Sequence, residues 1–180
     1  IKDDRTDPGP SADTKRKKVL SIKRFCKSYP NSGQSEKVLK DVSLDLFRGE
    51  TLGIIGESGS GKSTLAKMVL NILSRDEGEL ELIASNERIK NLTIPNKNIG
   101  AVLQDSSGSL NPRMNIQQIL SEPLKILGYS KKGEIKSKTI RAINEIGLDQ
   151  SFLDRYPHTL SGGQRQRVSI ARAMMLEPSV

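Results

Sequence analysis

The sequence predicts an α/β fold in which a short apolar strand leads into a glycine-rich loop, and the loop opens a helix. Residues 51–55 form an apolar run of the kind found in buried parallel strands. Glycine and serine dominate residues 56–63. Apolar residues then recur at helical spacing, which predicts a helix over residues 62–73, with Leu65, Met68, Val69, Ile72 and Leu73 on its apolar face.

The residues before this unit divide into a polar tail and two strands. Residues 1–18 carry many charges and almost no apolar side chains, so they bury too little surface to offset the entropy of ordering. We expect a disordered linker or tail there. In residues 19–29 and 38–47, aliphatic and β-branched residues partly alternate with polar ones, which predicts two strands.

The residues after the first helix predict two more strands and then a helical insert. The strands are expected over residues 79–83 and 99–104. The helical faces are marked by Ile116, Ile119, Leu120, Leu124 and Leu127, and then by Ile135, Ile143 and Ile146. Residues 105–162 are therefore expected to form an inserted helical subdomain, and residues 163–176 a last helix, within one folded domain over residues 19–180.

Composition limits the class of protein. The chain has 180 residues, 34% of them hydrophobic, which allows one domain a core of its own. No run is long and apolar enough to predict a membrane span, and no secretory signal is present, so a cytoplasmic location is expected. Cys26 is the only cysteine, which excludes an internal disulfide and is typical of a small core residue.

The charge balance raises the question of a nucleic-acid partner. A net charge of +8 and a pI near 9.6 suit nucleic acid or an anionic membrane surface. However, only 3% of the residues are aromatic, and the basic residues are dispersed except at residues 15–18. Stacking platforms for single strands are missing. A solvated surface is the preferred interpretation, and no nucleic acid is expected.

The loop matches the pattern G-x-x-x-x-G-K-[ST] between a predicted strand and a predicted helix. Its glycines let N–H groups turn towards phosphate oxygens, and the helix N-terminus adds its positive dipole end. Lys62 is expected to contact the β- and γ-phosphates, and the Ser63 hydroxyl to contact Mg²⁺. The predicted ATP-binding residues here are Gly56, Glu57, Ser58, Gly59, Ser60, Gly61, Lys62, Ser63 and Thr64.

A second motif narrows the class, because GTPases, kinases and motor proteins share the same loop. It is the pentapeptide Leu160, Ser161, Gly162, Gly163 and Gln164, at the start of the last predicted helix. Its serine and glycines offer a second anion-binding helix end. A simple helix cap would explain Ser161 alone. The loop and the pentapeptide together resemble those of ATP-binding cassette (ABC) ATPases over residues 19–180.

The resemblance implies a fold and an assembly. The fold would be a P-loop NTPase core of the RecA-like type, with an antiparallel β-subdomain and an inserted α-helical subdomain. The pentapeptide, which is the signature sequence of the family, would cover the γ-phosphate held by a partner's loop. The implied partners are therefore a second ABC ATPase domain, in a homo- or heterodimer, and transmembrane permease subunits, at the inner face of the cell membrane.

Two further positions match the family. Tyr29 lies where such ATPases place an aromatic ring that stacks on adenine, although an ordinary strand-end tyrosine remains an alternative. Gln104 matches the glutamine that contacts Mg²⁺ or the attacking water, which would make Gln104 and Lys62 catalytic and Gln104 and Ser63 the Mg²⁺ contacts. A polar strand end is the alternative for Gln104.

Other segments resemble the ATPase subunits of dipeptide and oligopeptide transporters. They are residues 109–114, 122–124 and 155–158. Residues 105–108 depart from that pattern, which leaves the transported solute open. The resemblance implies that residues 105–125 dock onto the membrane subunits, whereas their other role would be packing within the insert. His158 is expected to be a structural or surface residue, since the switch histidine of the family comes after the signature.

The predicted function is that of an ATP-binding subunit that couples ATP binding and hydrolysis to transport of a peptide-like solute. In the family a strand ending in Asp and Glu, and later the switch His, follow the signature helix, and the sequence stops at Val180 before them. We therefore expect a C-terminally truncated piece of a longer chain, with an incomplete sheet and little turnover of its own. The alternatives are a hydrolysis-deficient nucleotide-binding fragment and a soluble ABC ATPase without a transport role.

Overall fold

The structure is a computed structural model. It describes residues 16–31, 34–84, 87–90, 97–103, 108 and 110–180. The chain divides into two compact units, residues 1–94 and residues 95–180. The tail predicted over residues 1–18 lies mostly outside the described residues.

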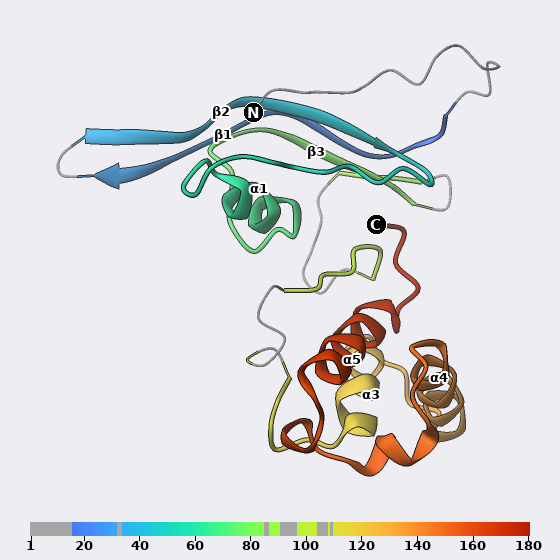
Figure 1. The fold of residues 1–180 in the computed structure, drawn as a ribbon. Coiled ribbons are helices and arrows are strands. Elements are labelled where there is room, and N and C mark those ends of the chain that lie inside the picture. The colour runs from blue at the N-terminus through green and yellow to red at the C-terminus, as the bar shows by residue number, and fades with distance from the viewer. Residues whose placement is uncertain (1–15, 32–33, 85–86, 91–96, 104–107, 109) are drawn as a thin grey trace, which may run out of the picture. The chain divides into compact units, whose positions relative to one another are not determined.

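The first unit is built on an antiparallel sheet (Figure 1). Its strands are β1 (Lys18–Asn31), β2 (Gln34–Phe47), β3 (Glu77–Ala84) and β4 (Glu87–Ile89), in the spatial order β2-β1-β3-β4. Both neighbours of β1 run antiparallel to it. The strands predicted by alternation over residues 19–29 and 38–47 are therefore confirmed, because a sheet with one covered face produces that pattern. The strand expected over residues 79–83 is confirmed as well.

Helix α1 (Lys62–Val69) lies against one face of this sheet (Figure 1). Leu65 and Met68 are each only 1% exposed, as the helical spacing predicted. The helix is shorter than expected, and Ile72 is exposed. It ends early because Asn71 adopts a left-handed backbone, with φ 56°, which asparagine tolerates better than most residues.

Two strand predictions are wrong for the described residues. Residues 51–55 and 99–103 are not strands, and Gln104 lies outside the description. Ile55 is 91% exposed and Ile54 is 40% exposed. A buried parallel strand needs paired neighbours on both sides and helices on its faces. The sheet of the described residues contains antiparallel pairs alone, so the apolar run 51–55 has no strand beside it.

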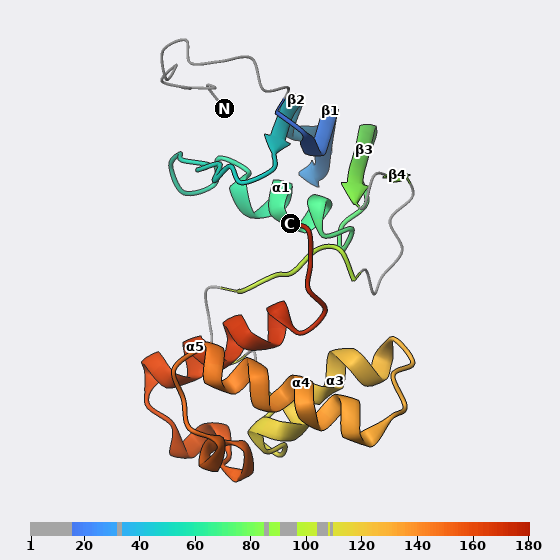
Figure 2. The ribbon, with the colours of Figure 1, turned by 90° about the vertical axis from the view of Figure 1, so that its right-hand side faces the viewer.

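The second unit is helical (Figure 2). It contains α3 (Ile116–Ile126), α4 (Lys132–Glu145), the 3₁₀ turns η1 (Gln150–Asp154) and η2 (Pro157–Thr159), and α5 (Gly162–Met174). The three α-helices pack on one another. Of the residues predicted on the apolar faces, Leu127 is only half-buried and Ile146 packs on the core while partly buried, and the others are confirmed as core residues. The shared core consists of Leu110, Ile116, Ile119, Leu120, Leu124, Ile135, Ala142, Ile143, Leu148, Leu153, Leu160, Val168, Ala171 and Met175.

Cys26 is buried at 6% exposure and free, as a small core residue would be. Within the described ranges, no helix has the length and hydropathy needed to cross a bilayer. The insert boundaries at residues 105 and 162 stay a prediction.

Candidate functional site

The glycine-rich loop leads directly into α1, with Gly61 as the N-cap. The Lys62 side chain folds back over the loop. Its ammonium donates to the backbone oxygen of Gly56 at 2.8 Å and to that of Glu57 at 2.6 Å, and it lies 3.2 Å from the Ser60 hydroxyl oxygen. The loop therefore gathers oxygen atoms around one cation at the start of a helix. An anion that approached this point would meet the ammonium and the positive end of α1.

Gly61 is required at its position for two reasons. Its φ is 91°, a left-handed conformation that side chains rarely adopt. A Cβ atom there would also lie 2.7 Å from Cδ2 of Leu39 and 3.2 Å from the Val38 backbone oxygen. Leu39 is only 1% exposed, so its side chain is enclosed by the core. Close packing of Gly61 against Val38 and Leu39 of β2 therefore holds the loop against this strand.

The residues of the loop fit a phosphate-bearing ligand. Residues 56–60 are exposed, Lys62 is half-buried, and the first N–H groups of a helix have no intrahelical acceptor. The Ser63 side chain is exposed at the same helix end, and Thr64 is half-buried behind it. In the described part of the chain, no cluster of three or more His, Cys, Asp or Glu residues could hold a metal.

Tyr29 lies near the end of β1 and is 38% exposed. The Lys27 ammonium lies 5.8 Å from the centre of its ring, within the range of a cation–π contact. Lys27 is in turn held by Asp76, at 2.7 Å from its Oδ1 atom. The ring is accessible for stacking, and its neighbourhood is fixed by an ion pair.

Asp76 is a residue that the sequence did not single out. Its Oδ2 accepts a 2.7 Å hydrogen bond from the backbone N–H of Ser28. The hydrogen bond from Lys27, followed by that from the Ser28 backbone, lowers the pKa of the Asp76 carboxyl. No local pattern could have revealed this role, because Lys27 lies 49 positions away in the chain.

The pentapeptide Leu160 to Gln164 opens α5, as predicted. Ser161 is the N-cap: its hydroxyl accepts from the Gln164 backbone N–H at 3.3 Å, and the Gln164 side chain accepts from the Ser161 N–H at 2.9 Å. This is a reciprocal capping box. Leu160 is buried, whereas Ser161, Gly162 and Gly163 are exposed. A cap and an accessible anion-binding end are therefore present in the same turn.

Gln104 and residues 105–107 lie outside the described residues, so their roles stay predictions. His158 is exposed and stacks on Tyr156, with ring centres 5.8 Å apart, as expected of a surface residue. The candidate site residues fall into both units: the loop and Tyr29 lie in the first, and the pentapeptide in the second.

Comparisons with known proteins agree with the family that both motifs indicate. Residues 39–180 match the family model described as ABC transporter. The chain is 44% identical over 151 residues to the oligopeptide transport ATP-binding protein OppF of Haemophilus influenzae, with 82% of this chain and 46% of that protein covered. It is 41% identical over 167 residues to the dipeptide transport ATP-binding protein DppF of the same organism, with 91% and 50% covered.

Solved structures give the same result for the fold. The ATP-binding cassette MJ0796, solved as a dimer in a post-hydrolysis state bound to ADP and Pi, has a TM-score of 0.73 and 30% identity. That match covers 89% of this chain and 71% of the other. The expected P-loop NTPase fold class is thereby confirmed. The chain spans about half the length of the curated relatives it matches.

Proposed function

Since the chain belongs to the ABC transporter family, we propose that it binds ATP for an importer of peptides. The observation that carries this proposal is the position of the Lys62 ammonium at the N-terminus of α1. It donates to the backbone oxygens of Glu57 at 2.6 Å and Gly56 at 2.8 Å. Phosphate oxygens can replace these backbone oxygens as acceptors for the Lys62 ammonium, because phosphate oxygens are strong acceptors and carry a formal negative charge.

Each remaining residue has a role in this proposal. The N–H groups of residues 56–64 and the Lys62 ammonium bind the β- and γ-phosphates. The Ser63 hydroxyl and Gln104 contact Mg²⁺, and Gln104 also orients the attacking water. Tyr29 stacks on the adenine, where its exposed ring leaves room for a planar base.

The pentapeptide of residues 160–164 acts on the ATP of a second ATPase domain. The exposed first turn of α5 supports this, because its hydroxyl and N–H groups form an anion-binding end of their own. Two such chains would share two ATP molecules. The similar cassette MJ0796, a dimer bound to ADP and Pi, supports the same kind of assembly for this chain.

We propose that the dimer docks on transmembrane permease subunits at the inner face of the cell membrane. The names of the OppF and DppF relatives support oligopeptides or dipeptides as the transported class. Hydrolysis would drive the cycle, as in the family.

ATP binding by the full chain tests the proposal. Lys62→Ala removes the cation, and we expect a loss of about tenfold to hundredfold in ATP affinity, the worth of one charge-assisted hydrogen-bond set. The matched control is Lys67→Ala, at an exposed lysine in the last turn of the same helix. It should bind ATP as the wild type does. Equal affinity of the Lys62→Ala and Lys67→Ala chains would overturn the proposed site.

The peptide class is tested separately, in the transporter complex reconstituted with its permease subunits. Peptide should strengthen ATP binding by the complex, and a sugar of similar size should not. Retention of the chain on immobilised nucleic acid at physiological salt would instead favour a soluble ABC ATPase without a transport role.

A further inference from the structure

Arg165 joins the two sides of the turn that opens α5. Its guanidinium Nη1 donates to the backbone oxygen of Leu160, the residue just before the N-cap. The two residues occupy the positions that flank a helix start in a hydrophobic staple, a contact that fixes the angle at which the chain enters a helix. In this chain a guanidinium–carbonyl hydrogen bond takes the place of that contact.

The turn is consequently held at several points. The Leu160 side chain is anchored in the helical core at 4% exposure. The capping box between Ser161 and Gln164 closes the first turn of the helix. The Arg165 bond adds a third tie, from the helix to the Leu160 backbone across the exposed glycines. Gly162 and Gly163 at the exposed helix end are thus enclosed between two anchored residues.

Helix stability alone does not account for an arginine here. A cation in the first turn opposes the helix dipole. The Arg165 Nε atom is also buried and, among the described residues, has no hydrogen-bond partner. Buried donors are nearly always paired, so such an exception calls for another reason. An apolar side chain would make a staple without opposing the helix dipole and without burying an unpaired donor. A positive charge beside exposed N–H groups, by contrast, favours binding of an anion.

We propose that Arg165 is a positioning residue for the signature turn of residues 161–163. It orients that turn towards the terminal phosphate of an ATP molecule bound to a second copy of the chain, and its charge raises the affinity of the turn for that phosphate. This rests on the shared ATP site proposed above. Arg165 acts through the turn and has no part in binding ATP to its own chain's loop.

Arg167 supplies a matched control on the same helix. Its Nη1 donates to the backbone oxygens of Ile146 at 3.2 Å and Gly147 at 3.4 Å, in the turn after α4. It is also an arginine that bonds carbonyl groups, but these carbonyl groups lie outside the signature turn. Arg165→Gln and Arg167→Gln remove the same charge two residues apart.

The first experiment measures two properties of the full chain with a non-hydrolysable ATP analogue. Affinity for the analogue in the monomer reports the chain's own loop, and we expect both variants to stay within about twofold of the wild type. Analogue-driven dimerisation reports the signature turn. We expect it to weaken about tenfold in Arg165→Gln, the loss typical of one charge-assisted hydrogen bond. Arg167→Gln should dimerise like the wild type, and equal losses in the two variants would overturn the proposal.

The second experiment mixes the Arg165→Gln chain with the Lys62→Ala chain. In a dimer of either variant alone, both shared sites contain one altered component, the signature turn or the loop. In a mixed dimer, the sound loop of the first chain faces the sound signature turn of the second. One intact site should return and trap the analogue. A misfolded Arg165→Gln chain could not be rescued in this way, so absence of rescue overturns the positioning role. A wild type that binds ATP yet stays monomeric would instead contradict the shared site itself.

Discussion

The Asp76 carboxylate connects the turn before β3 to β1, because its two oxygens accept from the Lys27 ammonium and from the Ser28 backbone N–H, each at 2.7 Å. The contact lies beside Tyr29, whose ring the same ammonium approaches. An ion pair with a backbone hydrogen bond thus fixes the strand end that carries the proposed adenine contact.

Asp76→Asn should lower stability in a pH-dependent way. The hydrogen bond from Lys27, and then that from Ser28, hold the pKa of Asp76 below its usual 3.8 in the folded chain. A carboxyl with a lowered folded pKa stabilises the fold above its unfolded pKa, and that stabilisation is lost as pH falls through the folded pKa. The melting temperature of Asp76→Asn should therefore lie below that of the wild type at neutral pH, and the two should converge in acid below 3.8.

Glu122→Gln is the control, since this carboxyl is exposed on α3, in the other unit of the chain. Its melting curve should follow the wild type at every pH. A difference between Asp76→Asn and the wild type that stays constant into strong acid would contradict the assigned ionic contact.

Gly61→Ala should destabilise the chain more than Gly59→Ala. Both glycines have positive φ, at 91° and 84°. An alanine in such a conformation costs about 1 kcal/mol or more. At Gly61 the new Cβ would also collide with the buried Leu39, which adds about 1–3 kcal/mol for overpacking. Urea unfolding followed by circular dichroism measures both, since the chain has no tryptophan.

The pair also separates the cost of the backbone conformation from the cost of the contact with Leu39. A Cβ atom at Gly59 would have nothing within 4 Å, so this variant isolates the cost of the backbone conformation. Equal losses of unfolding free energy in the two variants would show that the contact with Leu39 does not hold the loop on β2.

The helices of the second unit were predictable because an amphipathic period records burial directly. Ile116 and Leu124 lie at helical spacing on α3, Ile143 lies on the apolar face of α4, and each is fully buried. The run of residues 51–55 shows the limit of this reasoning. Burial of a parallel strand depends on neighbours distant in sequence, and an apolar run does not tell which neighbours are present.

The phosphate loop and the signature pentapeptide were recognisable because their chemistry is local. Gly61 must turn, Lys62 must follow, and Ser161 must cap, all within a few residues. Asp76 and Arg165 were missed for the opposite reason. Asp76 acts on a strand far away in the sequence, and Arg165 acts through a backbone oxygen, which carries no residue-type signal.

Ser161→Ala should reduce stability through loss of the N-cap, by about 1 kcal/mol. Gln164→Ala removes the reciprocal bond to the Ser161 N–H. Because the two bonds form one capping box, the double variant should lose less than the sum of the single losses. Guanidinium unfolding of the four chains completes this double-mutant cycle. Strict additivity would indicate that the two bonds form independently.

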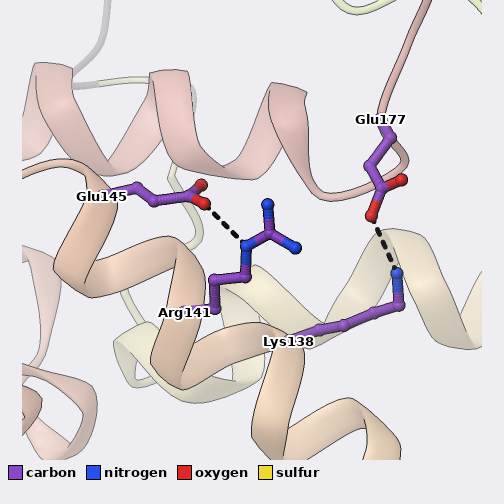
Figure 3. A network of polar contacts seen from close by, with 4 residues as sticks. All are labelled: Lys138, Arg141, Glu145 and Glu177. Atoms are coloured by element: carbon purple, nitrogen blue, oxygen red, sulfur yellow. Dashed lines mark hydrogen bonds and ion pairs between the residues drawn. The ribbon is translucent and has the colours of Figure 1, made fainter.

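The Lys138–Glu177 ion pair should contribute little by itself (Figure 3). The Glu177 carboxylate is 71% exposed and lies 3.1 Å from the Lys138 ammonium, and exposed pairs are worth less than about 1 kcal/mol. Lys138 also lies 5.9 Å from the centre of the Tyr129 ring. Lys138→Gln should therefore cost about 0.5 kcal/mol more than Glu177→Gln, the worth of an exposed cation–π contact.

The neighbouring pair Arg141–Glu145, one turn along α4, is the control for this comparison (Figure 3). Its 2.7 Å bond joins two exposed side chains, and no ring of the described residues is paired with Arg141, so Arg141→Gln and Glu145→Gln should cost similar amounts. Thermal melts at low and high salt measure all four variants. Salt screens the ion pairs and should remove most of the loss in Glu177→Gln. If Lys138→Gln loses no more stability than Glu177→Gln at high salt, Tyr129 does not hold the lysine.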